Sequence, residues 1–253
     1  KTYVAWCWKA GGAASSNTDG TITSSASANT TYGFSVVSYT GNNTAGATVG
    51  HGLGSDVKFL IVKSRGQNGQ YWHVWHSSFA NNEYAYLNST NGKTSGNDFL
   101  NGTAPGSSVF TLGSGNACNK SSDPVIAYAW SEVAGFSKFG SYTGSNTSGN
   151  KITTGFKPKF LLIKNSNSGG NWYLLDSNRG SAWLEANAAG AENSNSNIAI
   201  SYEDDGFTPS GSNVNTSGGT YIYAAFASKP DGSVVDSLVD SVTNYGDDTG
   251  LGG

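Results

Sequence analysis

A six-residue apolar motif occurs twice in this chain and limits the folds that the sequence can adopt. Lys58 to Lys63 reads Lys-Phe-Leu-Ile-Val-Lys, and about 100 residues later Lys159 to Lys164 reads Lys-Phe-Leu-Leu-Ile-Lys. Four apolar residues between two lysines are too few for a helix of ordinary length and are typical of a strand buried on both faces. We therefore expect two related β modules, each with this strand at its centre.

The similarity between the two copies extends on both sides of this motif. Upstream, Ser-Tyr-Thr-Gly at 38–41 returns at 141–144, and downstream the segment from Trp72 to Ser77 returns at 172–177. The period is far above the 20 to 50 residues of solenoids and propellers, so each repeat is a whole module. The sequence predicts an all-β chain of two tandem, duplicated, β-sandwich-like modules with little helix.

These patterns divide the chain into three parts. We expect a first module over residues 1–134, a second over 135–230, and a connector over 231–253 that leads to a further C-terminal domain. Val and Leu recur at helical spacing over 234–242 within that connector. A helical turn is also expected over 182–191 in the second module.

Strands are expected where aromatic and β-branched residues gather between turn signals. The expected strands cover 34–39, 59–63, 71–76, 109–112 and 125–133 in the first copy, and 160–164, 172–175, 198–202, 206–209 and 221–227 in the second.

The N-terminus resembles the closing strand of each module. Residues 2–9 read as a further strand, which either completes the sheet of the first module, the reading we favour, or belongs to a preceding copy. Residues 10–32 consist mainly of Gly, Ala, Ser, Thr and Asn and are expected to form a surface loop.

The charge content points away from several functional classes. Only 12% of the residues are charged, while 35 glycines and many Ser, Thr and Asn residues fill the polar positions. This composition favours an extracellular or virion-surface protein. A net charge of −3 argues against a nucleic-acid partner, which would need a basic face. No apolar run approaches 18 residues, so we expect no membrane insertion.

Residues capable of chemistry are present but show no recognised spacing. His51, His73 and His76 lack the spacing of metal ligands, and residues at i and i+3 face opposite sides of a strand. Glu203, Asp204 and Asp205 crowd into one turn, where solvation is the ordinary explanation. We expect no catalytic residues, no cofactor and no metal.

The two cysteines are too few for a disulfide framework. A disulfide between Cys7 and Cys118 would be compatible with the sequence, but a small buried apolar residue and an unpaired loop thiol are the simpler interpretation. Sequons occur at Asn29, Asn42, Asn88, Asn101, Asn119, Asn146 and Asn215, in a composition that produces them by chance.

Aromatic residues could stack on sugar rings or pack in the core. Trp72 and Trp172 occupy matching positions in the two copies, which favours core packing, and Trp75 is interpreted in the same way. A binding face is expected in the unmatched segments 81–101 and 181–197, where Tyr84, Tyr86 and Trp183 are the candidate glycan contacts.

Several longer stretches resemble a known but poorly characterised domain family. They are Tyr-Val-Ala-Trp-Cys-Trp-Lys-Ala-Gly-Gly at 3–12, Tyr-Thr-Gly-Asn at 39–42, the motif at 159–164, Asn-Trp-Tyr-Leu-Leu-Asp-Ser at 171–177 and Gly-Gly-Thr-Tyr-Ile-Tyr-Ala-Ala-Phe-Ala at 218–227. The resemblance is to a domain of bacteriophage and marine-virus structural proteins. In that family the domain lies beside concanavalin A-like or SPRY-like modules in tail-fibre and other virion-surface proteins. Residues 236–246 also resemble the segment that leads into such a SPRY-like module.

The resemblance implies a role and a location. The chain is expected to be a structural protein of a phage tail fibre or surface appendage, located on the virion surface or tail, that presents or contributes to host attachment. It implies a homo-oligomer, contacts with other virion proteins, and a host-surface glycan or protein as partner. The alternatives are a bacterial extracellular adhesin or matrix filament protein, and a polysaccharide-degrading enzyme that would use Asp176 or Glu203.

Overall fold

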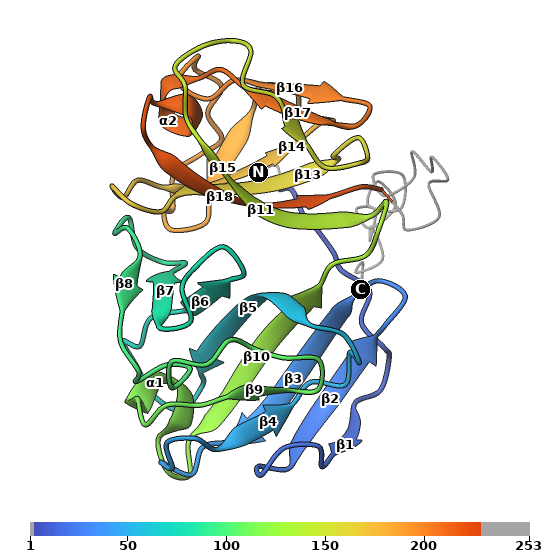
Figure 1. The fold of residues 1–253 in the computed structure, drawn as a ribbon, viewed down its shortest axis with the longest axis vertical. Helices are drawn as coiled ribbons and strands as arrows, with labels where there is room; N and C mark the ends of the chain where they lie inside the picture. The colour runs from blue at the N-terminus through green and yellow to red at the C-terminus, as the bar shows by residue number, and fades with distance from the viewer. Residues whose placement is uncertain (1–2, 229–253) are drawn as a thin grey trace, which may run out of the picture.

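The computed structural model describes residues 3–228, and these residues are nearly all β, as the sequence predicts. They form two stacked units, residues 15–131 and residues 137–226, joined by a short turn (Figure 1). The module boundary expected at 134 and 135 falls within that turn. The predicted connector 231–253, with its helical spacing over 234–242, lies outside the described residues.

The first unit contains one large sheet and one small sheet, all antiparallel. The large sheet has eight strands in the order β1 (Ser15–Asn17), β2 (Ser24–Asn29), β3 (Phe34–Thr40), β10 (Pro124–Ser131), β5 (Val57–Ser64), β6 (His73–His76), β7 (Glu83–Tyr86) and β8 (Thr94–Ser95). The small sheet pairs β4 (Thr48–Gly50) with β9 (Val109–Thr111), and the short helix α1 (Asn116–Asn119) follows β9.

The second unit contains a five-stranded and a three-stranded sheet, again antiparallel. The larger has the order β11 (Ser137–Thr143), β18 (Thr220–Phe226), β13 (Phe160–Asn165), β14 (Trp172–Asp176) and β15 (Trp183–Glu185). The smaller has the order β12 (Ile152–Thr153), β17 (Gly206–Pro209) and β16 (Ile200–Glu203), and the short helix α2 (Ser212–Asn215) follows β17.

The same strand order runs through both large sheets. The series β3-β10-β5-β6-β7 in the first unit corresponds to β11-β18-β13-β14-β15 in the second. The recurring apolar motif forms β5 and β13, and each lies beside the last strand of its unit. Phe59 pairs with Trp130 across β5 and β10, and Phe160 pairs with Phe226 across β13 and β18. Only the first sheet is extended by β1 and β2.

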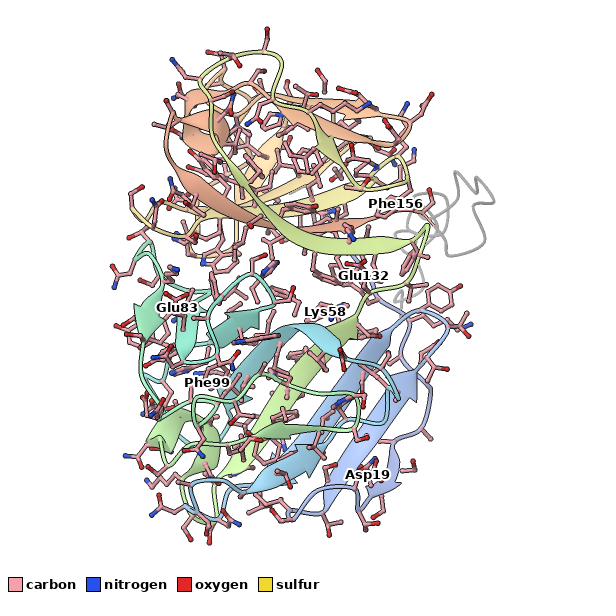
Figure 2. The ribbon with its side chains drawn as sticks, viewed as in Figure 1. Asp19, Lys58, Glu83, Phe99, Glu132 and Phe156 are labelled. Carbon is pink, nitrogen blue, oxygen red and sulfur yellow. The ribbon has the colours of Figure 1, made fainter. Side chains whose placement is uncertain are left out.

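The central strands are buried on both faces because a core lies on each side of them. Leu60 and Val62 face a core within the first unit, while Phe59 and Ile61 on the same strand face a core shared by both units. The second unit repeats this arrangement, with Leu161 and Ile163 in its own core and Phe160 and Leu162 in the shared one. Side chains fill the space between the units (Figure 2). This double burial explains the uninterrupted apolar motif.

The predicted N-terminal strand over residues 2–9 is wrong. Its described part belongs to an extended segment, residues 3–13, that pairs with no sheet and runs from the second unit to the first (Figure 1). The ring of Trp8 lies 5.3 Å from that of Phe160 and 6.0 Å from that of Trp130, so it packs against both units. Alternating aromatic residues that bury one face of an extended segment give the same pattern as a strand.

Two further expectations from local composition are also wrong. Residues 10–32 contain strands β1 and β2, because backbone pairing with β3 and small buried side chains such as Ala26 replace the usual apolar pattern. Residues 182–191 contain strand β15 instead of a helical turn, because Trp183 pairs with Leu175 and is buried. Tertiary packing overrides helix propensity here.

Candidate functional site

The three aromatic residues predicted to contact a glycan lie in different environments. Trp183 is 7% exposed in the core of the second unit, and Tyr84 is 5% exposed in the core of the first, so neither ring has an open face for stacking. Tyr86, two residues after Tyr84, is only half-buried. The structure therefore leaves Tyr86 as the one of the three that lies at the surface of a pocket.

Tyr86 lines a pocket of about 260 Å³ at the end of β7, beside the N-terminus of β6 and helix α1. Its walls come from segments far apart in the sequence. The lining residues are Gln70, Tyr71, His73, Tyr86, Asp98, Gly115, Asn116, Ala117 and Cys118. We call this the tyrosine pocket.

A stacked aromatic pair forms one wall of the tyrosine pocket. The rings of Tyr71 and Tyr86 lie 4.3 Å apart between centroids, at an interplanar angle of 28°. Tyr71 is 46% exposed, and it is one of the three large exposed hydrophobic residues within residues 3–228. An exposed aromatic ring with polar groups beside it is a surface on which the ring of a ligand can stack.

His73 packs against the ring of Tyr86 in this stacked pair. Its ring lies edge-on to Tyr86, with 5.0 Å between centroids, and it is buried against Phe99. Burial lowers the pKa of His73 below its ordinary value, so the imidazole is neutral near pH 7. His76, three residues on, faces the opposite side of the sheet, where Nε2 lies 3.0 Å from the carbonyl oxygen of Tyr223 in the second unit. The two histidines therefore face opposite sides, as predicted.

Polar side chains form the rim of the tyrosine pocket. Asp98 is exposed, and its Oδ1 accepts a 3.1 Å hydrogen bond from the hydroxyl of Tyr84. Within residues 3–228 the side-chain amides of Gln70 and Asn116 make no hydrogen bond, while their backbone carbonyl oxygens accept from Lys63 and Gln67. One carboxylate and two amides thus surround the exposed ring of Tyr71.

Cys118 lines the pocket, is buried, and has an unreactive thiol. Its Sγ lies 3.4 Å from the carbonyl oxygens of Asp98 and Phe99. Burial raises the pKa of Cys118 to about 12, so the thiolate is absent near pH 7. Cys7 is exposed, and both cysteines are free.

The equivalent place in the second unit has a different chemistry. His73 pairs with Tyr86 across β6 and β7, and Tyr173 pairs with Glu185 across β14 and β15. By this register Glu185 takes the place of Tyr86, and Asn171 takes that of Tyr71. Asn171 donates a hydrogen bond to Glu185 and accepts one of 2.8 Å from Asn187. A polar network thus replaces the stacked tyrosines.

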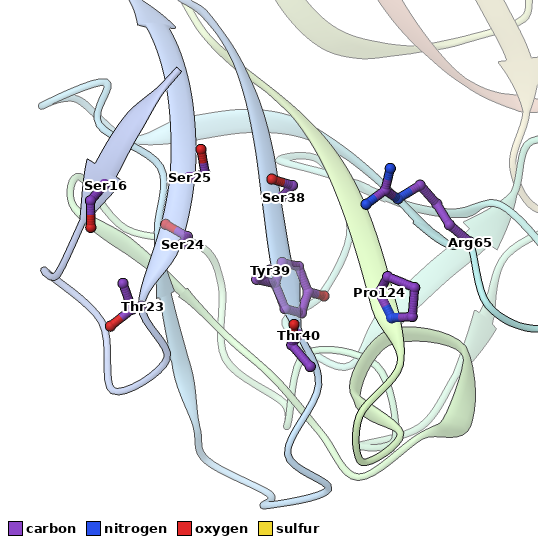
Figure 3. Close-up of a pocket in the computed structure, with 9 residues that line it drawn as sticks. All are labelled: Ser16, Thr23, Ser24, Ser25, Ser38, Tyr39, Thr40, Arg65 and Pro124. Atoms are coloured by element: carbon purple, nitrogen blue, oxygen red, sulfur yellow. The ribbon is translucent and has the colours of Figure 1, made fainter. Parts of the chain in front are cut away.

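A second, shallower hollow of about 390 Å³ lies over strands β1, β2, β3 and β10 (Figure 3). Hydroxyl groups and one guanidinium dominate its lining, which consists of Ser16, Thr23, Ser24, Ser25, Ser38, Tyr39, Thr40, Arg65 and Pro124. Tyr39 is buried, and its hydroxyl donates to the carbonyl oxygen of Cys118. The hollow therefore offers hydrogen bonds but no open aromatic face.

The carboxylates considered for hydrolysis hold the fold together. Asp176 Oδ2 accepts hydrogen bonds of 2.6 Å from Arg179 Nε and 3.2 Å from Trp6 Nε1, which fastens the N-terminal segment to the second unit. Glu203 accepts hydrogen bonds from Thr208 and Lys151, and these bonds lower its pKa. Neither carboxylate lines the tyrosine pocket or the shallow hollow.

Residues 3–228 contain no group of three or more His, Cys, Asp or Glu side chains placed to hold a metal ion. Within the same residues, every helix is too short and too polar to cross a bilayer.

Comparison with known protein families gives one match, over residues 1–230, to a domain of unknown function, DUF7483. The chain belongs to the DUF7483 family. The match covers both units and the N-terminal segment of the DUF7483 chain, so the family model spans the whole described structure. No curated protein and no solved structure matches it.

Proposed function

We propose that this DUF7483 protein is a non-catalytic structural part of a phage tail fibre or virion-surface appendage that contributes to host attachment. The observation that carries the proposal is the shared core, in which Phe59, Trp130 and Phe160 are buried between the two units. A body without a flexible linker suits a part that must hold a binding surface in a fixed place. The sequence resemblance to virion-surface domains and the low charge content support the same role.

The proposal includes an internal duplication. Besides the common strand order, each unit has a buried asparagine whose hydrogen-bond partners lie at matching positions. Asn119 accepts from the backbone N of Asn42 and donates to the carbonyl oxygen of Thr44. Asn215 does the same with Ser145 and Thr147. Two copies of one ancestral module explain this repetition more simply than two independent origins.

The proposed partners are further copies of the chain, other virion proteins, and a host-surface glycan or protein. Fibre proteins act in several copies, so many weak sites can reach useful avidity together. The proposed location is the virion surface or tail.

Imaging of the native assembly tests this function. Cryo-electron microscopy of virions that carry this gene, with the chain traced in the density, is expected to place both units on a tail fibre or surface appendage. Cellular filaments built from the same chain, in bacteria free of phage, would overturn the proposal in favour of an adhesin or matrix protein.

A further inference from the structure

The tyrosine pocket has the composition of a saccharide site, an exposed aromatic ring with a carboxylate and two amides beside it. The ring of Tyr71 remains 46% exposed although it stacks on Tyr86. Leaving an aromatic ring in water forgoes stabilisation that burial would give. The matching position in the second unit, Asn171, forms hydrogen bonds to its neighbours instead. The same scaffold thus folds without the tyrosines.

We propose that the tyrosine pocket binds one neutral pyranose ring of a host-surface glycan, an inference that rests on the attachment function proposed above and names its ligand. The apolar face of the sugar lies on the open ring of Tyr71, in the manner of aromatic platforms. The sugar hydroxyls hydrogen-bond to the side chains of Gln70, Asp98 and Asn116 on the rim.

The size of the pocket sets the size of the ligand. Its volume of about 260 Å³ lies just below the range of roughly 300 to 1,000 Å³ that is typical of sites for drug-sized molecules. It therefore holds a single ring, with the rest of a glycan chain directed into solvent. Exposed hydroxyl contacts and one stacking platform give weak binding at one site, which many copies on a fibre would strengthen.

The charges around the pocket select against acidic sugars. Asp98 contributes a carboxylate to the rim. Among the residues that the structure describes, no lysine or arginine lines the pocket, and the ammonium of Lys63 donates to the carbonyl oxygen of Gln70 at 2.6 Å and lies over the ring of Trp72. A uronic or sialic acid would bring a second carboxylate close to Asp98, whereas a neutral hexose can donate its hydroxyl protons to it.

The test uses the full chain and saturation-transfer NMR with the methyl glycosides of glucose, galactose, mannose and N-acetylglucosamine. We expect saturable binding of at least one of these probes, and weaker binding of methyl glucuronide. The variant Tyr71→Asn, which copies the residue of the second unit, is expected to weaken binding by about 5-fold or more. Tyr71→Phe keeps the ring and is expected to bind like the wild type.

Asn171→Ala in the second unit is the matched control and should leave glycoside binding unchanged. Thermal unfolding of each variant shows that the fold is intact, and Asp98→Asn provides a second variant whose loss of discrimination against methyl glucuronide tests the rim. Absence of binding to all four neutral glycosides, or equal binding by wild type and Tyr71→Asn, overturns the proposal.

This outcome is separate from that of the imaging experiment. A chain that lies on a fibre but binds none of the glycosides refutes the saccharide site and leaves the attachment function standing. A chain that binds a glycoside but builds cellular filaments refutes the virion function and leaves the site standing.

Discussion

The two units place the same lysine and tryptophan in opposite surroundings. Lys63 donates to the carbonyl oxygen of Gln70 and lies over Trp72, and Lys164 donates to that of Gly170 and lies over Trp172. The first pair is half-exposed, whereas Lys164 and Trp172 are almost completely buried. One local motif can therefore be a surface feature in one unit and part of a joint in the other.

The difference arises from the loop after β7 of the first unit, which covers the second lysine. The carbonyl oxygen of Thr90 accepts hydrogen bonds from Lys164 Nζ at 3.0 Å and from the backbone N of Gly170 at 2.7 Å. Burial lowers the pKa of Lys164 to about 8. Nothing in the described chain covers Lys63 in this way. The surroundings supplied by the other unit, and not the motif itself, decide its role.

Substitution of the matched buried asparagines tests how alike the scaffolds are and is expected to have the largest effect. Asn119→Ala and Asn215→Ala each remove three hydrogen bonds made by a buried side-chain amide. Each should lower the free energy of unfolding by about 3 to 4 kcal/mol, measured by urea titration. Losses that differ by more than about 2 kcal/mol would show that the two scaffolds are not equivalent.

Acid should destabilise the first unit more than the second, because all three histidines belong to the first unit. Burial lowers the pKa of His76 from 6.5 to about 4, and burial lowers those of His51 and His73 as well. The unfolded chain binds more protons in this window, so stability is complete above pH 6.5 and falls as pH decreases toward about 4. His76 alone should contribute a loss of about 2 to 3 kcal/mol.

Urea titrations at about pH 7 and about pH 4.5 measure this loss, and hydrogen exchange locates it. Amides of β5 and β6 should lose protection before those of β16 and β17. His76→Gln, which keeps a donor for Tyr223, should reduce the pH dependence. Earlier loss of protection in the second unit would contradict this interpretation.

Replacement of Lys164, which the loop after β7 covers, and of Lys63, which no such loop in the described chain covers, compares the two surroundings of the motif. Lys164→Met leaves the carbonyl oxygen of Gly170 without its donor, whereas that of Thr90 keeps the backbone N of Gly170, and the change should cost about 1 to 2 kcal/mol after the gain from removing a buried charge. Lys63→Met should cost less than about 1 kcal/mol, because water can reach the carbonyl oxygen of Gln70.

The pH dependence of the same variants gives an independent check. Because the folded pKa of Lys164 lies below its ordinary value of 10.5, stability of the wild type should rise between about pH 8 and 10.5. Lys164→Met should lack this rise, whereas Lys63→Met should retain it. Identical alkaline profiles for the wild type and Lys164→Met would mean that Lys164 is not buried as described.

Two glycines that precede Trp72 and Trp172 give the smallest expected difference in stability. Gly69 and Gly169 both have positive φ, 76° and 83°, so alanine costs about 1 kcal/mol at either position. A Cβ at Gly169 would also lie 2.8 Å from the carbonyl oxygen of Thr90, whereas one at Gly69 meets nothing within 4 Å. Gly169→Ala should therefore cost about 1 kcal/mol more in thermal unfolding. Equal costs would show that the loop that carries Thr90 moves away from the added Cβ without a loss of stability.

The sequence predicts those parts of the fold that depend on strong local patterns. The motif of β5 and β13 identifies buried strands because four apolar residues must be covered on both faces. Strand β2 escapes prediction because its Ser and Ala side chains give no hydrophobic period, and its partner β3 supplies the register. The N-terminal segment is predicted wrongly because pairing depends on an open sheet position, and β10 already fills the place between β3 and β5.

The candidate site could be predicted only in part. The interpretation that binding residues lie in the unmatched segment 81–101 identifies Tyr86, but Tyr71 and Asn116 come from other parts of the chain and meet only in the fold. A signal was present in the difference between the two units. Tyr71 and Tyr86 occupy the positions at which the second unit has Asn171 and Glu185, and this paired difference between aromatic and polar residues marks the same place.

The shared core also affects how such proteins can exchange parts. Separation of the units at the turn between Ser131 and Ser137 would remove cover from Phe59 on one side and Phe160 on the other, and Trp8 would lose its contacts with one of the units. Recombination between related genes at that turn would join apolar surfaces shaped for different neighbours. The smallest piece that can be transferred intact is therefore the pair of units together with the N-terminal segment.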